Sequence, residues 1–511
     1  MRQAMMGVDI GTTGCRAVIF QQDGKCLANQ SLEYSLYTPQ AAWAEQDPEE
    51  IFQAFVQVVR GSMAASGLRP DELAGICFSS VMHSIFPVDH TGKPLHNMLI
   101  WADSRSQAYT EKLAQEYDAK KLYVKTGCPL HPMYLLSKLL WFREERRPVF
   151  AASYKFIGIK EFICYRLFGK FLVDKSIATT TAIYNLETQA WDDEILDILG
   201  IDASLLSEVK PTTHVEPGLS AEMAELLGVA AATPVILGAA DGILSNLGAG
   251  AVNPGQITAM IGTSGAIRIV TDRPQIDERM RTWCYNMTDS HWVVGGAINN
   301  GGIALRWVRD KFACMEQYVA ERSGYDPYDI LSRYAAEEPV GSDGLIMLPF
   351  FSGERAPYYN ANARGVLFGL NLTHGKRHLV RATMEGVLYS LFSVFRALEE
   401  VTGKSNEIRV SGSFTRSPFW VQLMADIFGR VITVLDDPEG AAFGAAVLGY
   451  FAMGQMTDIK EVNNLINIKK RYQPDLANHE RYQRLVAVYE RLYHKLEAEF
   501  EEIASIQREW K

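Results

Sequence analysis

Two short turns built from glycine and hydroxyl residues constrain the fold of this chain more than any other feature. The first, Gly-Thr-Thr-Gly at 11–14, separates apolar runs at 6–10 and 15–20. The second, Gly-Thr-Ser-Gly at 262–265, separates similar runs about halfway along the chain. An apolar run, a tight turn and another apolar run predict a β-hairpin. One such hairpin opening each half predicts a duplicated architecture.

Both turns have the chemistry of an anion-binding loop. Glycine lets the backbone bend and approach a ligand, while Thr12 and Thr13 add hydroxyl donors to the backbone N–H groups. Asp9 stands just before the first turn, where its carboxylate would repel phosphate unless a cation lay between them. We therefore predict phosphate loops that hold a nucleotide between the halves, with Asp9 positioning Mg²⁺. For one turn alone, an ordinary hairpin is the alternative, and neither turn has the Gly-x-x-x-x-Gly-Lys-Ser/Thr pattern of a P-loop.

The length and the order of the remaining patterns predict an α/β fold with two domains. A chain of 511 residues exceeds what one hydrophobic core supports. We place the boundary in a glycine-rich segment, which gives domains 1–248 and 249–511. Asp47 and Pro48 favour a helix start, because Asp is a good cap and Pro fits the first turn. Small residues at 438–446 predict a helix built for close packing.

Composition and charge exclude several classes of function. The net charge of −10 argues against nucleic-acid binding, which needs a basic surface. No apolar run is long enough to cross a bilayer, and the N-terminus runs straight into the first strand without a signal peptide, so the cytoplasm is expected. The seven cysteines are scattered without a Cys-x-x-Cys pair, which disfavours disulfides and zinc. The oligomeric state stays open, with a homodimer as one option.

Asp241 is the candidate catalytic base. It stands at the end of the apolar run 234–240, much as Asp9 stands near the end of the first apolar run. Phosphoryl transfer needs the phosphates held and the nucleophile aligned, and a hydroxyl acceptor gains from a carboxylate that takes its proton. A helix cap after a strand is the alternative role for Asp241. Gly412 and Ser413 follow a predicted strand and are candidates for the nucleoside pocket, with a plain strand–helix turn as the alternative.

A second group of polar and aromatic residues is a candidate acceptor site. Met82 and His83 lie just past a buried strand, where open α/β sheets bind ligands. His83 is interpreted as a hydrogen-bonding group for a polyol or as a satisfied core histidine, since no second ligand at metal-binding spacing accompanies it. Trp101, Asp103 and Arg105 alternate along the chain, which predicts an aromatic wall beside a polar pair. A buried ion pair without a ligand is the alternative for Asp103 and Arg105.

At this point the sequence resembles the FGGY carbohydrate kinases over essentially the whole chain. The two turns resemble the phosphate motifs of that family, and 411–417 with 422–426 resembles its adenosine motif. The most specific match begins Gly-Val-Leu-Phe-Gly-Leu at 365–370 and closes at 378–385. An earlier signature around Ser137 fits less well, because Leu135 stands where the family has a small residue or proline.

The resemblance implies two actin-like (ribonuclease H-like) domains that close on MgATP and a sugar hydroxyl. By the resemblance, Asp241 is the base, Asp9 lies at the metal, and Gly302 and Arg306 approach the nucleotide. Ser417 stands where the family more often has Asn. The expected ATP-binding residues are Gly11, Thr12, Thr13, Gly262, Thr263, Gly302, Arg306, Gly412, Ser413 and Ser417. The expected acceptor-binding residues are Met82, His83, Trp101, Asp103, Arg105, Lys160 and Asp241.

The expected acceptor is D-gluconate, phosphorylated to 6-phosphogluconate. The segments 101–105, 131–133 and 157–161 resemble the gluconate-specific members, whereas Ser80-x-Met82-His83 also occurs in forms that resemble xylulose kinases. Xylulose or another pentulose or polyol is therefore the alternative. A sugar acid needs a cation for its carboxylate, and Lys160 and Arg105 are the candidates, unless they are ordinary ion-paired residues. An actin-type assembly or chaperone protein and a sugar sensor without catalysis are the rivals from other classes.

Overall fold

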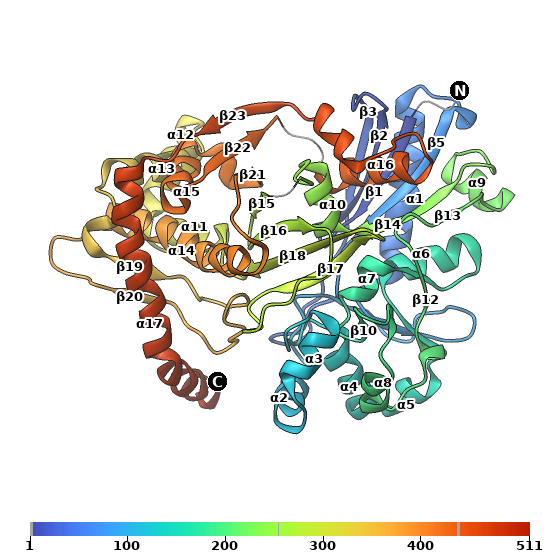
Figure 1. Cartoon of the computed structure of the whole chain (residues 1–511), viewed down its shortest axis with the longest axis horizontal. Coiled ribbons are helices and arrows are strands. Elements are labelled where there is room, and N and C mark those ends of the chain that lie inside the picture. The colour runs from blue at the N-terminus through green and yellow to red at the C-terminus, as the bar shows by residue number, and fades with distance from the viewer. Residues whose placement is uncertain (1–3, 254, 437–439, 511) are drawn as a thin grey trace.

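The chain folds into two β-sheets, each covered by helices (Figure 1). The computed structural model describes residues 4–253, 255–436 and 440–510. The first sheet has the strand order β13-β14-β5-β1-β2-β3. In that order, its strands are Val215–Glu216, Val235–Ala240, Leu73–Ser80, Ala4–Ile10, Gly14–Gln21 and Cys26–Glu33. Strand β1 pairs antiparallel with β2 and parallel with β5.

The second sheet repeats this pattern. Its order is β17-β18-β16-β15-β21-β22-β23. In that order, its strands are Trp283–Thr288, His291–Ile298, Gly265–Thr271, Gln256–Ile261, Glu407–Ser411, Val431–Leu435 and Ile468–Tyr472. Strand β15 pairs antiparallel with β16 and parallel with β21, as β1 does with β2 and β5. The predicted pair of hairpins and the duplicated α/β architecture are confirmed.

Helices cover the sheets and build a separate lobe on the first half. Helix α1 (Pro48–Ser66) packs on β2 and β3, and Asp47 caps it by accepting from the Glu49 N–H at 2.9 Å. Helix α14 (Lys376–Thr402) packs on β16 and β18, and α17 (Leu476–Glu509) runs along the outer side of the second half (Figure 1). The helices of the lobe are α2 Gln107–Glu116, α3 Ala119–Thr126, α4 Leu135–Glu145, α5 Arg147–Ala152 and α8 Asp193–Leu199. In the same stretch of chain, α6 Ile159–Phe168 packs on α1 and β5, and α7 Lys175–Thr179 contacts β14 and β17.

The remaining elements connect these parts. The short strands are β4 Glu45–Gln46, β6 Phe86–Val88, β7 Met98–Leu99, β8 Lys155–Ile157, β9 Leu172–Asp174, β10 Tyr184–Asn185, β11 Ala190–Trp191, β12 Glu208–Lys210, β19 Ile346–Leu348 and β20 Val366–Phe368. The further helices are α9 Ala221–Leu227, α10 Asp241–Gly248, α11 Gly302–Phe312, α12 Cys314–Ser323, α13 Pro327–Glu337, α15 Pro418–Phe428 and α16 Gly440–Ala452.

Helices α10 and α16 pack against each other and join the two halves. They follow equivalent strands, β14 and β22, and they meet backbone to backbone. A Cβ added to Gly444 would lie 2.0 Å from the Leu244 carbonyl oxygen, and one added to Gly248 would lie 2.2 Å from that of Gly440. The predicted small-residue helix is thus confirmed from Gly440 onward, while Pro438 and Glu439 lie outside the described residues.

Helix α16 also covers the first sheet, although it comes from the second half of the sequence. A Cβ on Gly7 of β1 would lie 1.9 Å from the Ala442 carbonyl oxygen, so only glycine permits this approach. The division at 248/249 therefore stays a proposal about the sequence, because the chain after it returns to the first sheet. Within the described residues, no disulfide joins any of the seven cysteines. Among the residues that the structure describes, no helix is both long and apolar enough to cross a membrane.

Candidate active site

A cleft of about 1030 Å³ is lined by residues from both halves. The first turn lines it with Gly11, Thr12, Thr13 and Gly14. The second turn lines it with Ser264 and Gly265, whereas Thr263 is exposed at the tip and, like Gly262, does not line the cleft. The structure thus brings both predicted turns to one cleft, and the second contributes its later residues.

The first turn is held by hydrogen bonds before any ligand binds. The Gly11 N–H donates to the Gly14 carbonyl at 3.0 Å. The Trp101 indole N–H donates to Thr12 Oγ1 at 2.9 Å, and the Gln46 amide donates to the Thr12 carbonyl at 2.8 Å. An array of donors fixed in advance is what a phosphate site requires. Trp101 therefore joins the turn to the neighbouring acceptor region.

The second turn is supported from behind by the start of α11. The Gly302 N–H donates to the Gly262 carbonyl at 2.7 Å, and the Gly301 N–H donates to the Thr263 carbonyl at 3.0 Å. A Cβ on Gly301 would lie 2.4 Å from the Ser264 carbonyl oxygen, which leaves no room for another residue type. Arg306 is exposed on α11 and does not line the cleft.

Part of the predicted nucleoside segment, residues 411–417, lines the same cleft. Gly412 and Ser413 line it. Gly412 has a φ of 96°, and a Cβ added there would lie 2.5 Å from the Ile261 carbonyl oxygen. Such a position favours glycine. Ser417 does not line the cleft, and its hydroxyl instead caps α15 by accepting from the Trp420 N–H at 3.2 Å.

Two carboxylates line the cleft, Asp9 near the end of β1 and Asp241 directly after β14. Asp9 accepts a hydrogen bond from the Ser79 hydroxyl at 2.7 Å. Asp241 is the first residue of α10, and one oxygen accepts from the Gly242 N–H at 2.6 Å. Burial, followed by the negative charge of Asp9, raises the pKa of Asp241 to about 7. Asp241 thus lines the cleft, whereas Ala240 occupies the N-cap position of α10 and no side chain caps the helix, so the alternative role of a helix cap does not describe Asp241.

The two carboxylates fit a magnesium ion that also binds phosphate. Magnesium is held in such sites by one or two carboxylates together with substrate phosphates and waters, rather than by a cage of protein ligands. Within the described part of the chain there is no group of three or more His, Cys, Asp or Glu side chains arranged to hold a metal. Asp9, beside the first turn, has the oxygen chemistry and the position for this role.

His83 presents a neutral ring to the cleft. Its Nδ1 lies 2.8 Å from the Thr180 carbonyl, which only accepts, so we assign the proton to Nδ1 and leave Nε2 as an acceptor. Burial and the Lys138 ammonium lower the pKa of His83 to about 3. Its backbone has a φ of 62°, and its carbonyl accepts from Lys138 Nζ at 2.8 Å. Met82 and Trp101 also line this region.

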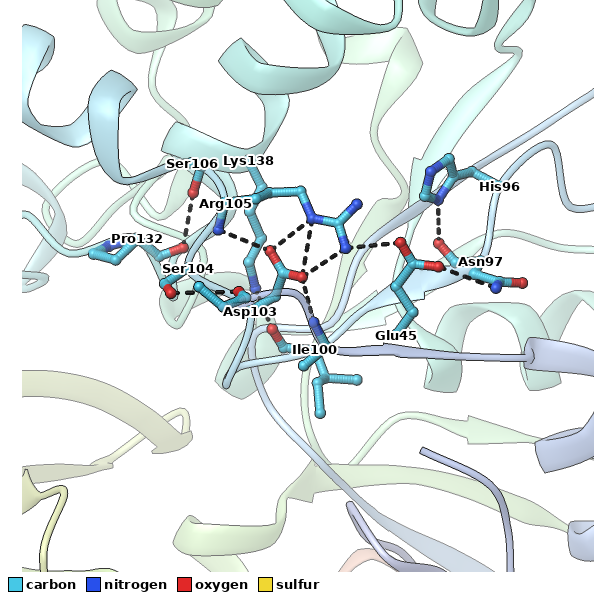
Figure 2. A network of polar contacts seen from close by, with 12 residues as sticks. Glu45, His96, Asn97, Ile100, Asp103, Ser104, Arg105, Ser106, Pro132 and Lys138 are labelled. Atoms are coloured by element: carbon cyan, nitrogen blue, oxygen red, sulfur yellow. Dashed lines mark hydrogen bonds and ion pairs between the residues drawn. The ribbon is translucent and has the colours of Figure 1, made fainter. Parts of the chain in front are cut away.

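Asp103 and Arg105 form a buried network away from the cleft (Figure 2). The Arg105 guanidinium donates to Asp103 and Glu45, each at 2.7 Å, and its side chain is 1% exposed. It also lies over the Trp43 ring, 3.7 Å from the centroid. Neither residue lines the cleft, which favours the alternative of a buried ion pair, and contact of Asp103 or Arg105 with an acceptor stays a prediction.

Lys160 is also paired within the protein. Its Nζ lies 2.6 Å from Asp174 Oδ2, both side chains are buried, and neither residue lines the cleft. The sequence could not reveal these partners, because Glu45 lies 60 residues from Arg105 and Asp174 lies 14 residues from Lys160, on the strand after α6. Because each cation is already paired within the protein, the structure favours the alternative of ordinary ion-paired residues, and contact of Lys160 or Arg105 with a substrate carboxylate stays a prediction.

Sequence reasoning missed Arg268 and Arg355, two of the cations that line the cleft. Arg268 lies within β16, flanked by apolar residues, and Arg355 follows the buried segment 345–350. A charged residue inside an otherwise apolar strand was a signal for Arg268, since an unpaired buried charge is unfavourable. Arg355 carried no such periodic signal, because it belongs to an irregular segment.

Comparisons with known proteins agree with this geometry. Residues 4–248 match the N-terminal domain, and residues 257–453 the C-terminal domain, of the FGGY family of carbohydrate kinases. The chain is 42% identical to a gluconokinase of Bacillus subtilis over 510 residues, 99% of both chains. Structures of a gluconate kinase and of a ligand-bound xylulose kinase, both from Lactobacillus acidophilus, each superpose with a TM-score of 0.92 at 34% identity over 98% of this chain and 99% of theirs. The chain belongs to the FGGY family of carbohydrate kinases.

Proposed function

We propose that this chain is an ATP-dependent kinase that phosphorylates the terminal hydroxyl of D-gluconate to give 6-phosphogluconate. The observation that carries the proposal is the carboxylate of Asp241, which lies in a cleft bordered by both phosphate-type turns and has a pKa raised to about 7. A base with a pKa near the working pH combines the correct protonation state with sufficient proton affinity.

Asp241 acts on the acceptor hydroxyl. As its O–H bond breaks, the proton passes to the carboxylate, and the acceptor oxygen forms a bond to the γ-phosphorus of ATP. The bond between that phosphorus and the bridging oxygen of ADP breaks at the same time, so ADP leaves with the electron pair. Because this transfer involves little covalent chemistry for the protein, alignment and charge stabilisation supply most of the catalysis.

The turns hold the phosphates. Backbone N–H groups and the hydroxyls of Thr12, Thr13 and Ser264 donate to phosphate oxygens, and Gly412 and Ser413 leave space for the nucleoside. A magnesium ion held by Asp9 would neutralise phosphate charge and orient the γ-phosphoryl group. Nucleotide contact stays a prediction from the family resemblance for five residues, which are Gly262, Thr263, Gly302, Arg306 and Ser417.

The acceptor lies beside His83 and Trp101. The neutral His83 ring offers Nε2 as an acceptor for a substrate hydroxyl, and Met82 and Trp101 provide the apolar wall against which the carbon chain packs. Water competes with the sugar hydroxyl for the γ-phosphoryl group, so closure of the two halves about the α10–α16 contact favours transfer to the sugar.

Two comparisons favour gluconate over xylulose. One is the relative named a gluconokinase, which matches over 99% of both chains, and the other is the gluconate kinase structure. The xylulose kinase structure, equally similar, keeps a pentulose as the second candidate. The test is a coupled ADP-release assay with D-gluconate, D-xylulose, glycerol and L-rhamnulose at equal concentrations. We expect kcat/KM to be highest for gluconate. A higher kcat/KM for xylulose would make xylulose the proposed substrate. If none of the four acceptors caused ADP release, the proposal of a sugar kinase would be contradicted.

A further inference from the structure

Two arginines in the cleft form no close ion pair with any residue that the structure describes. Arg268 of β16 is 7% exposed, and Arg355 lies on the segment after β19. The Nε atoms of both are buried without a hydrogen-bond partner. Within the same described residues, neither guanidinium forms an ion pair within 4.0 Å, whereas Arg105 and Lys160 do. The cleft therefore contains two cations with spare donors.

The carboxylates whose charges act most on these arginines are Asp241 for Arg268 and Glu354 for Arg355, and neither forms an ion pair within 4.0 Å with its arginine. Glu354 accepts hydrogen bonds from the backbone N–H groups of Asn299 and Arg355 and from the Ser390 hydroxyl, so its oxygens are directed at other donors than the Arg355 guanidinium. One Arg355 nitrogen donates to the Ile298 carbonyl at 3.1 Å. A guanidinium stays protonated in a protein, and an unpaired buried charge is unfavourable, so an anion is expected at this place.

The two arginines lie at different places along the cleft. Arg268 is near the candidate base, and Arg355 is near the residues expected to bind the acceptor. Arg268 faces Asp241, because its charge opposes the rise in the Asp241 pKa and its Nη2 lies 2.9 Å from the position of a Cβ on Gly242. Arg355 faces the other way: its guanidinium lies 5.3 Å from the Trp101 ring centroid and its charge lowers the pKa of His83. A linear acceptor with a hydroxyl at Asp241 would extend past Arg268 toward Arg355.

We propose that Arg268 and Arg355 together bind the carboxylate of the acceptor and so make the cleft selective for linear sugar acids over the corresponding alcohols. The inference deepens the proposed function and rests on it for the direction of the acceptor. Guanidinium groups suit this role, since their planar donors match the two oxygens of a carboxylate and such bonds are about twice as strong as neutral ones. It replaces Lys160 and Arg105, whose charges are neutralised by Asp174 and by Asp103 and Glu45.

The same donors would also suit the γ-phosphoryl group of ATP. The position of Arg355 beside Trp101 and His83, on the acceptor side, favours the carboxylate. The two sources of the anion make different predictions. Loss of a carboxylate contact weakens the binding of sugar acids alone, whereas loss of a phosphoryl contact weakens ATP binding or lowers kcat for every acceptor.

The test compares D-gluconate with D-glucitol, which differs only in having an alcohol in place of the carboxylate. Binding of each to the full-length protein is measured by calorimetry, in the wild type and in Arg268→Gln and Arg355→Gln. We expect the wild type to prefer gluconate, and each variant to lose about 10- to 100-fold of that preference, as for a charged hydrogen bond. Arg268→Lys and Arg355→Lys, which keep the charge, should keep part of the preference.

Arg416→Gln is the matched control, because Arg416 also lines the cleft but lies next to the predicted nucleoside segment. It should leave the ratio of gluconate to glucitol affinity unchanged. Thermal unfolding checks that each variant is folded. The preference of the wild type for gluconate over glucitol tests the proposal even if a variant fails to fold. A wild type that binds glucitol as tightly as gluconate overturns the proposal, as does an equal loss for both ligands, or a loss confined to a non-hydrolysable ATP analogue.

Binding of D-galactonate and D-galactitol distinguishes a failure of the carboxylate site from a failure of the proposed substrate. If gluconate is not phosphorylated but galactonate is preferred over galactitol through the two arginines, the proposed substrate is wrong and the carboxylate site stands. If gluconate is phosphorylated and the substitutions leave the acid-to-alcohol ratio unchanged, the kinase stands and the carboxylate site is wrong.

Discussion

Replacing Asp241 by Asn should stabilise the protein while removing its activity. Burial and the charge of Asp9 raise the pKa of Asp241 from 3.8 to about 7, so the folded protein binds this proton more tightly than the unfolded chain. Stability therefore falls as pH rises between these values, and the full loss is present above the folded pKa. Asparagine has nearly the same shape and cannot be charged, so it removes this loss.

The size of the effect follows from the shift. About three pKa units correspond to about 4 kcal/mol at most. Because Asp241 is partly exposed in the cleft, solvent screening reduces this value, and we expect about 1–3 kcal/mol of added stability at pH 8. At pH 5 the advantage should shrink to about a third, since only about one unit then separates the pH from the unfolded pKa. Turnover should fall by about 10²- to 10⁴-fold.

Urea unfolding at both pH values, in low-salt buffer without nucleotide, measures the stability change. Asp103→Asn is the control, because Asp103 is buried and bound to Arg105 and the Ala44 N–H. That variant should be destabilised at both pH values, since it leaves part of a buried cation unpaired. An Asp241→Asn protein no more stable than the wild type at pH 8, or with an advantage that does not shrink at pH 5, would refute the account of Asp241 as a destabilised catalytic carboxylate.

Three further predictions concern the same machinery. In the wild type, kcat/KM for the acceptor should rise with pH through about 7, because the Asp241 base is active when deprotonated; a pH–rate profile flat between pH 6 and 8 would contradict it. Gly444→Ala should lower the free energy of unfolding by about 1–3 kcal/mol, since its Cβ would lie 2.0 Å from a carbonyl oxygen, whereas Gly375→Ala, with nothing within 4 Å, should not; equal effects in thermal unfolding would contradict the helix contact. Lys160→Met should destabilise by about 3–5 kcal/mol, by leaving Asp174 buried and unpaired, yet leave the gluconate-to-glucitol affinity ratio unchanged; a selective loss of gluconate binding would return Lys160 to the acceptor site.

The sequence was sufficient where the signal was local. Turn residues between apolar runs predicted both hairpins, and Asp47 with Pro48 predicted the start of α1. Asp241 was found because a polar residue after a buried strand of an α/β sheet lies at the ligand edge. In each case, the residues that determine the structure are within a few positions of one another.

The partners of Arg105 and Lys160 were harder to predict, because a charge in the sequence does not identify its partner. Arg105 pairs with Glu45 and Lys160 with Asp174, and only the folded chain brings these side chains together. Ser417 was predicted near the nucleotide, but a serine before proline and an apolar helix is also a good cap, and its hydroxyl caps α15. Arg268 and Arg355 come from separate segments, so their proximity to one cleft was not visible in the pattern of either.

The position of Asp241 at the start of α10 links the chemistry to the arrangement of the two halves. The helix begins at the candidate base and ends at Gly248, where its backbone touches α16. Helix α10 has only eight residues, and at the glycines no side chain separates it from α16. A shift of α16 should therefore move α10 and the candidate base with it. Asp9 is tied to the same helix, since β1 contacts α16 through Gly7. The elements that carry the two carboxylates therefore both contact α16, and a larger residue at Gly444 should lower kcat as well as stability.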